Sequence, residues 1–210
     1  MTHPATALPT EPVSTFYGYD RGTPVDRIYI EAFLAQHADA ITGHAAEIKD
    51  DTYIKRYGRG VTTTTVIDID PTNPHATLYA DLTAPGTLPE SAFDALVVTH
   101  TLQLLSDPAT ALANCHSALT PGGTLLLTTP TVGRLSLSSP EADYWRITPP
   151  GLTRLLADWD GEVTVTGHGN LAACLAMLLG HAAEELTPGT LDRHDPGYPL
   201  LACALAHRPR

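Results

Sequence analysis

Carboxylate side chains stand where three short β-rich runs of the sequence end. Glu47, Asp70 and Asp81 each lie at or just after such a run. A carboxylate accepts hydrogen bonds through both oxygens, so one side chain can hold two neighbouring hydroxyl groups. Asp70 follows Glu47 by 23 residues, close to the interval of about 20 residues at which nucleotide-binding folds place an acid on ribose. The spacing indicates a nucleoside site, with turn capping by these Asp side chains as the open alternative.

Candidate proton acceptors follow two other runs. His100 follows the apolar run Phe93–Thr99, and His168 follows the alternating run 162–167. Histidine titrates near neutral pH and can take a proton from a hydroxyl group. We therefore expect His100 to be the leading candidate for a general base, with His168 and Tyr144 as further catalytic candidates. A structural role at a strand end is the open alternative for His100.

Four consecutive residues could border an acceptor molecule. Tyr144 and Trp145 offer flat apolar walls, and the guanidinium group of Arg146 can bind an anion through two parallel hydrogen bonds. We expect Asp143, Tyr144, Trp145 and Arg146 to bind the substrate. The alternative is a packed connection before the helix that begins after Thr148.

Seven β-rich runs alternate with helical patterns along the chain, which predicts an α/β protein. The expected strands cover residues 45–49, 64–70, 76–80, 93–99, 124–129, 162–167 and 198–206. The expected helices cover residues 24–37, 108–119, 149–156 and 171–186. Residues 93–99 and 124–129 are almost continuously apolar, as in strands covered on both faces. We expect a mostly parallel sheet of about seven strands with helices on both faces, and ligands beyond the carboxyl ends of its strands.

Composition sets limits on the partners. The chain has 210 residues, which suits one domain; we expect it over residues 21–210, behind a flexible arm at 1–20. Its 12 basic and 23 acidic residues give a formal charge of -11, so nucleic acid is not expected as a partner. The longest apolar run, Leu171–Leu179, is too short to cross a bilayer, and the first residues lack an apolar leader, which favours a cytoplasmic location. The cysteines and histidines lack metal-ligand spacing, so no metal site is expected.

Two longer sequence blocks contain the expected fourth and fifth strands together with the residues that flank them. Residues 88–108 read LPESAFDALVVTHTLQLLSDP, and residues 119–130 read LTPGGTLLLTTP. Together with Glu47 and the residues after the second and third runs, they resemble the class I S-adenosylmethionine-dependent methyltransferases over about residues 21–206. The closer likeness is to small bacterial methyltransferases of glycan or natural-product pathways, through residues 70–74 (DPTNP) and 145–149 (WRITP).

The resemblance implies a Rossmann-like methyltransferase fold and S-adenosylmethionine as the cofactor. It implies that Glu47 and Lys49 contact the methionyl part of the cofactor, and that Asp70 and Pro71 contact the ribose. It also implies that Asp81 and Leu82 contact the adenine, and that Thr99 and His100 border the sulfonium. The first motif of the family is a glycine-rich turn, ExGxGxG, whereas Lys49 replaces its first glycine here and no glycine follows before Gly58. Glycine at that place allows a tight turn and a close approach of the cofactor to the backbone.

The resemblance implies methyl transfer to a small molecule, and we expect an oxygen of a sugar-like or secondary-metabolite acceptor. Lys49 motivates the alternative, a methyltransferase fold that no longer methylates and serves as a partner-binding subunit or catalyses another reaction such as a cyclisation. A nicotinamide-dependent enzyme is disfavoured by the absence of GxGxxG. The apolar residues 171–179 offer a surface for a second copy, which would make a homodimer.

Overall fold

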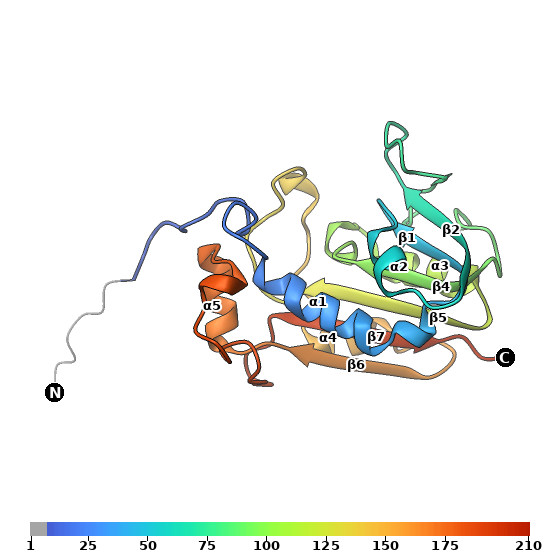
Figure 1. The fold of residues 1–210 in the computed structure, drawn as a ribbon. Coiled ribbons are helices and arrows are strands. Elements are labelled where there is room, and N and C mark those ends of the chain that lie inside the picture. The colour runs from blue at the N-terminus through green and yellow to red at the C-terminus, as the bar shows by residue number, and fades with distance from the viewer. Residues whose placement is uncertain (1–7) are drawn as a thin grey trace.

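Seven strands form one sheet in the computed structural model, which describes residues 8–210 (Figure 1). The order of the strands is β3-β2-β1-β4-β5-β7-β6, and all neighbours are parallel except that β7 runs antiparallel to β5 and β6. Their bounds are β1 Gly43–Ile48, β2 Val61–Asp68, β3 Leu78–Tyr79, β4 Phe93–Thr99, β5 Leu119–Pro130, β6 Val163–His168 and β7 Leu201–His207. The predicted fold class is confirmed.

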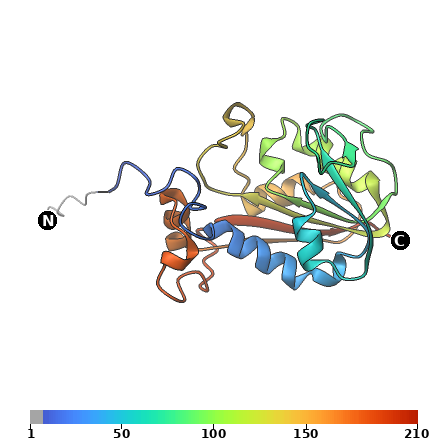
Figure 2. The ribbon, with the colours of Figure 1, turned by 45° about the horizontal axis from the view of Figure 1, so that its top comes forward.

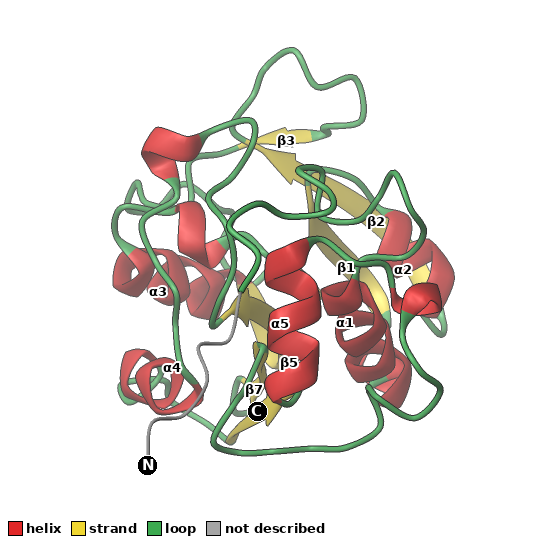
Figure 3. Cartoon of the chain, turned by 90° about the vertical axis from the view of Figure 1, so that its left-hand side faces the viewer, coloured by secondary structure: helices red, strands yellow, loops and turns green. Residues whose placement is uncertain are grey.

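Helices cover both faces of this sheet. The α-helices are α1 Val25–Gln36, α2 Thr52–Tyr57, α3 Pro108–Ala118, α4 Pro149–Leu155 and α5 Leu171–Leu179. Short 3-10 helices are η1 Ala38–Ala40, η2 Leu102–Leu104, η3 Pro140–Ala142 and η4 Ala183–Glu185. In Figure 3 the strands lie between α1, α2 and α5 on one side and α3 and α4 on the other.

The central strands are buried on both faces, as their apolar sequences predict. In β4, Leu96 and Val98 face the core beneath α3 and α4, while Ala95 and Val97 face the core beneath α1 and α5. Successive side chains of a strand point to opposite faces, so a strand between two cores has no polar side to expose. This is why residues 95–98 of β4 and 125–127 of β5 are all apolar.

Two predicted helix starts are confirmed by their caps. The side chain of Asp107 accepts a hydrogen bond from the backbone of Thr110 at the start of α3. The side chain of Thr148 accepts a hydrogen bond from the backbone N–H of Gly151 at the start of α4. Both caps satisfy backbone N–H groups that a helix leaves unpaired at its first turn.

The prediction of a helix over residues 171–186 is wrong in its second half. The helix α5 ends at Leu179, and Gly180 adopts a left-handed conformation with φ of +74°. A Cβ atom at Gly180 would collide with the carbonyl of Ser14, so glycine is the residue that allows the chain to pass here. Beyond it, Glu184 accepts hydrogen bonds from the backbone and hydroxyl of Thr23. Thr23 therefore does not cap α1, whose N-cap position is Pro24 and has no side-chain cap.

The segment before α1 contacts α5 (Figure 2). The backbone N–H groups of Val13 and Ser14 donate to the carbonyl of Leu179, at 2.8 and 3.3 Å. The Ser14 hydroxyl is buried and accepts from the backbone of Phe16 and Gly18. Of the arm predicted at residues 1–20, the first seven residues lie outside the described part of the chain, and residues 13–20 are bonded to the domain.

Candidate functional site

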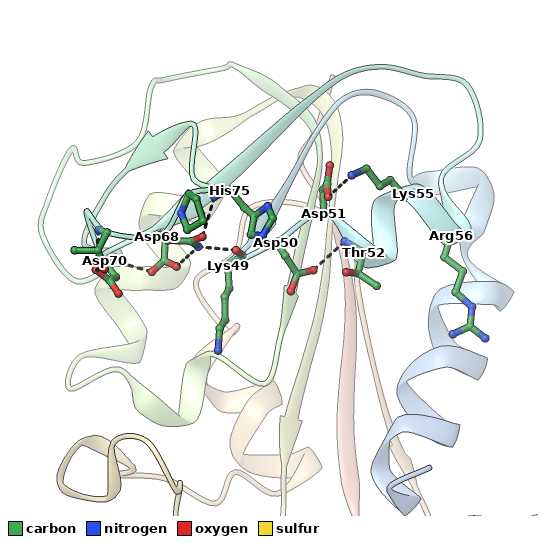
Figure 4. Close-up of a pocket in the computed structure, with 12 residues that line it drawn as sticks. Lys49, Asp50, Asp51, Thr52, Lys55, Arg56, Asp68, Asp70 and His75 are labelled. Atoms are coloured by element: carbon green, nitrogen blue, oxygen red, sulfur yellow. Dashed lines mark hydrogen bonds and ion pairs between the residues drawn. The ribbon is translucent and has the colours of Figure 1, made fainter. Parts of the chain in front are cut away.

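The carboxyl ends of β1 and β2 border a hollow with a volume of about 810 Å³ (Figure 4). The charged side chains that line it are Asp50, Asp51, Asp68, Asp70, Lys49, Lys55 and Arg56. Four carboxylates against three basic groups give the lining a net negative charge. The volume lies within the range of about 300–1,000 Å³ that is usual for small-molecule sites.

The strand β2 ends at Asp68, two residues before the predicted end. Oδ1 of Asp68 accepts from the backbone of Asp70 at 3.0 Å, and Oδ2 accepts from the Asn73 side chain at 2.6 Å. The same Asn73 amide donates to the carbonyl of Lys49 at 2.7 Å. Asn73 thus links the turn after β1 to the end of β2 across the lining of the hollow. Sequence reasoning missed Asp68, although it follows Glu47 by 21 residues and fits the interval of about 20.

Asp70 lines the hollow but lies in the turn that follows the strand. Its Oδ1 accepts from both the backbone and the hydroxyl of Thr72, at 2.8 and 2.7 Å. These two hydrogen bonds lower the pKa of Asp70, because they favour its ionised form. Pro71 follows in the same turn. The carboxylate is exposed, and its second oxygen has no hydrogen-bond partner among residues 8–210.

Lys49 keeps the backbone of a glycine turn without being glycine. Its φ of +76° lies in the left-handed region, where a side chain is strained. Asp51, two residues further on, pairs with Lys55 at 2.8 Å. In Figure 4 the Lys49 side chain extends away from that pair, and no carboxylate within residues 8–210 lies in ion-pair distance of it. The turn after β1 therefore has the positive φ that favours glycine, and it carries the ammonium group of Lys49.

Glu47 is buried and holds the start of α2. It is 3% exposed, and its carboxylate accepts from the backbone N–H groups of Tyr53 at 3.2 Å and Ile54 at 2.8 Å. Burial raises the pKa of Glu47 to about 7, against the opposing effect of the two N–H donors. Glu47 therefore stabilises the loop that borders the hollow, and its carboxylate is turned toward the backbone.

The residues predicted around the adenine and the sulfonium lie outside the lining of this hollow. Asp81 accepts from the backbone and hydroxyl of Thr83, and Leu82 is 5% exposed within the core beneath α3. Thr99 is the last residue of β4, and His100 follows it with a φ of +45°. The structure therefore brings Lys49 and Asp70 together, and it places Asp81, Leu82 and Thr99 on neighbouring strand ends.

The two candidate histidines are not in one site. His168 is the last residue of β6 at the far edge of the sheet, and its Nε2 lies 3.0 Å from the hydroxyl of Thr166. β5 and β7 separate β6 from β4, which carries His100. Three strand spacings amount to roughly 14 Å, too far for both rings to reach one reacting atom.

The predicted substrate-binding segment is bonded to itself and to η2. Arg146 binds Asp143 through two parallel hydrogen bonds, of 2.5 and 2.9 Å. The backbone N–H groups of Tyr144 and Trp145 donate to the carbonyl of Gln103, while the two residues are 52% and 42% exposed. The guanidinium group that was expected to bind an anionic substrate is thus occupied by Asp143.

Two kinds of feature are absent from the part of the chain that the structure describes. Within residues 8–210 no three His, Cys, Asp or Glu side chains gather closely enough to hold a metal ion. In the same part of the chain, no helix combines the length and apolar character that crossing a bilayer requires.

The strand order, the antiparallel β7 and the carboxylates at the strand ends define a Rossmann-like methyltransferase fold. A family profile described as "Methyltransferase domain" matches residues 25–173. The chain belongs to this family and is a methyltransferase. No curated protein sequence matches the chain significantly.

Solved structures share the fold at low sequence identity. A methyltransferase described as S-adenosylmethionine dependent from Mesorhizobium loti is 15% identical, with a TM-score of 0.58 over 91% of this chain and 100% of that chain. A similarly described protein from Archaeoglobus fulgidus is 13% identical, with a TM-score of 0.57 over 87% and 94%. The [4+2]-cyclase SpnF is 17% identical, with a TM-score of 0.59 over 90% and 84%. At these identities the likeness concerns the fold alone.

Proposed function

We propose that the protein transfers a methyl group from S-adenosylmethionine to an oxygen of a small-molecule acceptor of sugar-like or secondary-metabolite type. The observation that carries the proposal is the hollow at the ends of β1 and β2, with carboxylates on its wall and a net negative charge. S-adenosylmethionine has a diol for such carboxylates and a net positive charge for such a lining. When bound, it supplies an electrophilic methyl group on a sulfonium.

The residues proposed to hold the cofactor come from adjoining strand ends. Asp68 and Asp70 share the ribose hydroxyls, since both carboxylates line the hollow. Asn73 keeps the turn at Lys49 in place through its two hydrogen bonds. The other cofactor-binding roles stay predictions, namely those of Glu47, Lys49, Pro71, Asp81, Leu82, Thr99 and His100.

Catalysis then depends mainly on geometry. Holding the acceptor in line with the methyl group accounts for most of the barrier reduction that such a site can supply. An oxygen acceptor also needs a group that takes its proton, and His100 is the proposed base. His168 and Tyr144 stay predictions as catalytic residues. The substrate contacts also stay predictions, namely Asp143, Tyr144, Trp145 and Arg146.

Calorimetric titration with S-adenosylmethionine and with S-adenosylhomocysteine tests the proposal. We expect the wild type to bind both ligands, and Asp68→Ala and Asp70→Ala each to weaken binding by tenfold or more. Glu90→Ala is the matched control, because Glu90 is exposed and lies outside the hollow. Undiminished binding by both aspartate variants would contradict the assignment of the ribose site.

Lys49 supports a second candidate, a methyltransferase fold that no longer methylates. Its ammonium group would stand beside a cationic cofactor, which disfavours binding. The fold likeness to the [4+2]-cyclase SpnF is compatible with a non-methyl reaction. A wild type that binds neither ligand, together with a Lys49→Gly variant that does, supports this candidate over methyl transfer.

The proposed assembly is a homodimer through α5. Leu171, Leu175 and Leu178 lie three and four residues apart along the helix and are 47%, 51% and 45% exposed. Side chains at this spacing share one helix face. Light scattering of the purified wild type and of Leu175→Lys measures the mass directly, and a monomeric wild type contradicts the proposal. The cytoplasmic location also stays a prediction.

A further inference from the structure

Three buried polar atoms without a hydrogen-bond partner belong to residues that contact one another at the end of β4. They are Oδ1 of Asp26, Nε2 of His100 and Oε1 of Gln103. We call Asp26, His100 and Gln103 the His100 cluster. Buried polar atoms are normally hydrogen bonded, because an unpaired one loses its bonds to water and gains none. Three such atoms in one cluster indicate a place that bonds a ligand.

The cluster joins α1, the end of β4 and η2. Nδ1 of His100 lies 3.4 Å from Oδ2 of Asp26. The side-chain nitrogen of Gln103 donates to the carbonyl of His100 at 2.7 Å. Asp26 and Gln103 are each only 7% exposed. Because Gln103 uses its nitrogen on the backbone, its oxygen is the end left for a ligand.

The neighbours of His100 decide where its proton resides. The carboxylate of Asp26 beside Nδ1 favours a proton there, which leaves the lone pair on Nε2. The other charged groups that face the ring are Arg27 of α1, and Asp143 and Arg146 of the segment after β5. Burial lowers the pKa of His100 to about 4; Asp26 and Asp143 oppose this effect, and the two guanidinium groups add to it. The ring is therefore neutral at pH 7 and can accept a proton.

We propose that the His100 cluster binds a neutral acceptor rich in hydroxyl groups and rejects carboxylates. The three open atoms are an imidazole nitrogen with a lone pair, a carboxylate oxygen and an amide oxygen, and all of them accept hydrogen bonds. A polyol or sugar ring supplies donors on neighbouring carbons, whereas a carboxylate supplies none and would be repelled by Asp26. Arg146 does not reverse this preference, because it is bonded to Asp143.

This inference deepens the proposed function and rests on it for the identity of the reaction. The acceptor hydroxyl that donates to Nε2 is the one that reacts. Its O–H bond breaks while an N–H bond forms at Nε2, the electron pair stays on oxygen, and the carboxylate of Asp26 offsets the charge of the imidazolium. His100 is then the catalytic residue and Asp26 a positioning residue. The three atoms are closed off from solvent in this structure.

Nitrogen NMR of the full chain with ¹⁵N-labelled histidine, recorded without cofactor, tests the cluster. We expect His100 to be the Nδ1–H tautomer at pH 7. Asp26→Asn should remove that preference and lower the pKa of the ring further, because the charge that favours the imidazolium is lost. Asp39→Asn is the control, since the Asp39 side chain is 86% exposed and paired with Arg59. An unchanged tautomer in Asp26→Asn overturns the assignment of Asp26.

The ligand class is tested with matched probes at millimolar concentration, namely neutral methyl glycosides and myo-inositol against the corresponding uronic acids. We expect at least one neutral probe to shift the Nε2 resonance of His100, the Gln103→Met variant to weaken its binding by about tenfold, and the uronic acids to cause no shift. Absence of a shift from every neutral probe, or equal shifts from the uronic acids, overturns the proposal. Because these spectra need no cofactor, a failed cofactor titration beside a positive probe result overturns only the proposed function.

Discussion

Replacement of Glu47 by Gln should make the stability of the protein much less dependent on pH. The ordinary pKa of the carboxyl group is 4.5, and burial raises it to about 7 in the folded chain. A raised folded-state pKa means that folding favours the protonated form. The resulting stabilisation is complete below the unfolded value of 4.5 and is lost as the pH rises through 7. Between pH 5 and pH 8 the wild type should lose about 2.5 kcal/mol of unfolding free energy relative to Glu47→Gln.

Urea denaturation of both proteins at pH 5, 6, 7 and 8 measures this difference. Glu90→Gln is the matched control, because it makes the same substitution at an exposed glutamate. In thermal scans the same effect corresponds to a relative change in Tm of about 5–10 °C. A difference between wild type and Glu47→Gln that stays constant from pH 5 to pH 8 would refute the reasoning. A difference that grows in favour of the wild type with pH would mean that the N–H groups of Tyr53 and Ile54 hold the carboxylate ionised.

Three smaller perturbations test single features of the backbone. Lys49→Gly should raise the unfolding free energy by about 0.5–1 kcal/mol, because relief of left-handed strain exceeds the entropy cost of glycine; a loss of stability in urea denaturation contradicts this. Gly180→Ala should lower stability by about 2 kcal/mol or more, since its φ is +74° and the new Cβ would collide with Ser14; an unchanged Tm contradicts it. Asp107→Ala should cost about 1 kcal/mol through loss of the α3 cap on Thr110; calorimetry with no change in Tm rules out that contribution.

Local chemistry made most of the fold predictable. The bounds of β4 follow from a continuous apolar run, and the starts of α3 and α4 follow from Asp107 and Thr148 before a proline. These signals act within one turn or one strand, so a single sequence contains them in full. The end of α5 at Leu179 was not predicted, because a pattern of apolar and charged residues continues past Gly180. Only the packing of Ser14 against that glycine makes the turn there necessary.

The candidate site was predictable in its location and less so in its residues. Placing carboxylates at the ends of β1 and β2 required only the strand order and the known crevice of open sheets. The choice between Asp68 and Asp70 depended on where β2 ends, and a strand end shifts by two residues without any local signal. The role of Arg146 could not be predicted from its residue type. In the sequence, Arg146 and Asp143 are both plausible substrate contacts, and only the folded segment shows that they bind each other.

The sequence by itself determined the order of the strands along the chain, the mostly parallel sheet with two buried faces and the family, since periodicity, caps and short motifs are local properties. The tertiary structure alone decided which polar groups meet. Asp26 and His100 are separated by most of the first half of the domain, and Asn73 reaches back to the carbonyl of Lys49. Such contacts exist because the folded chain removes these groups from water and leaves each of them only the partners that packing has brought near.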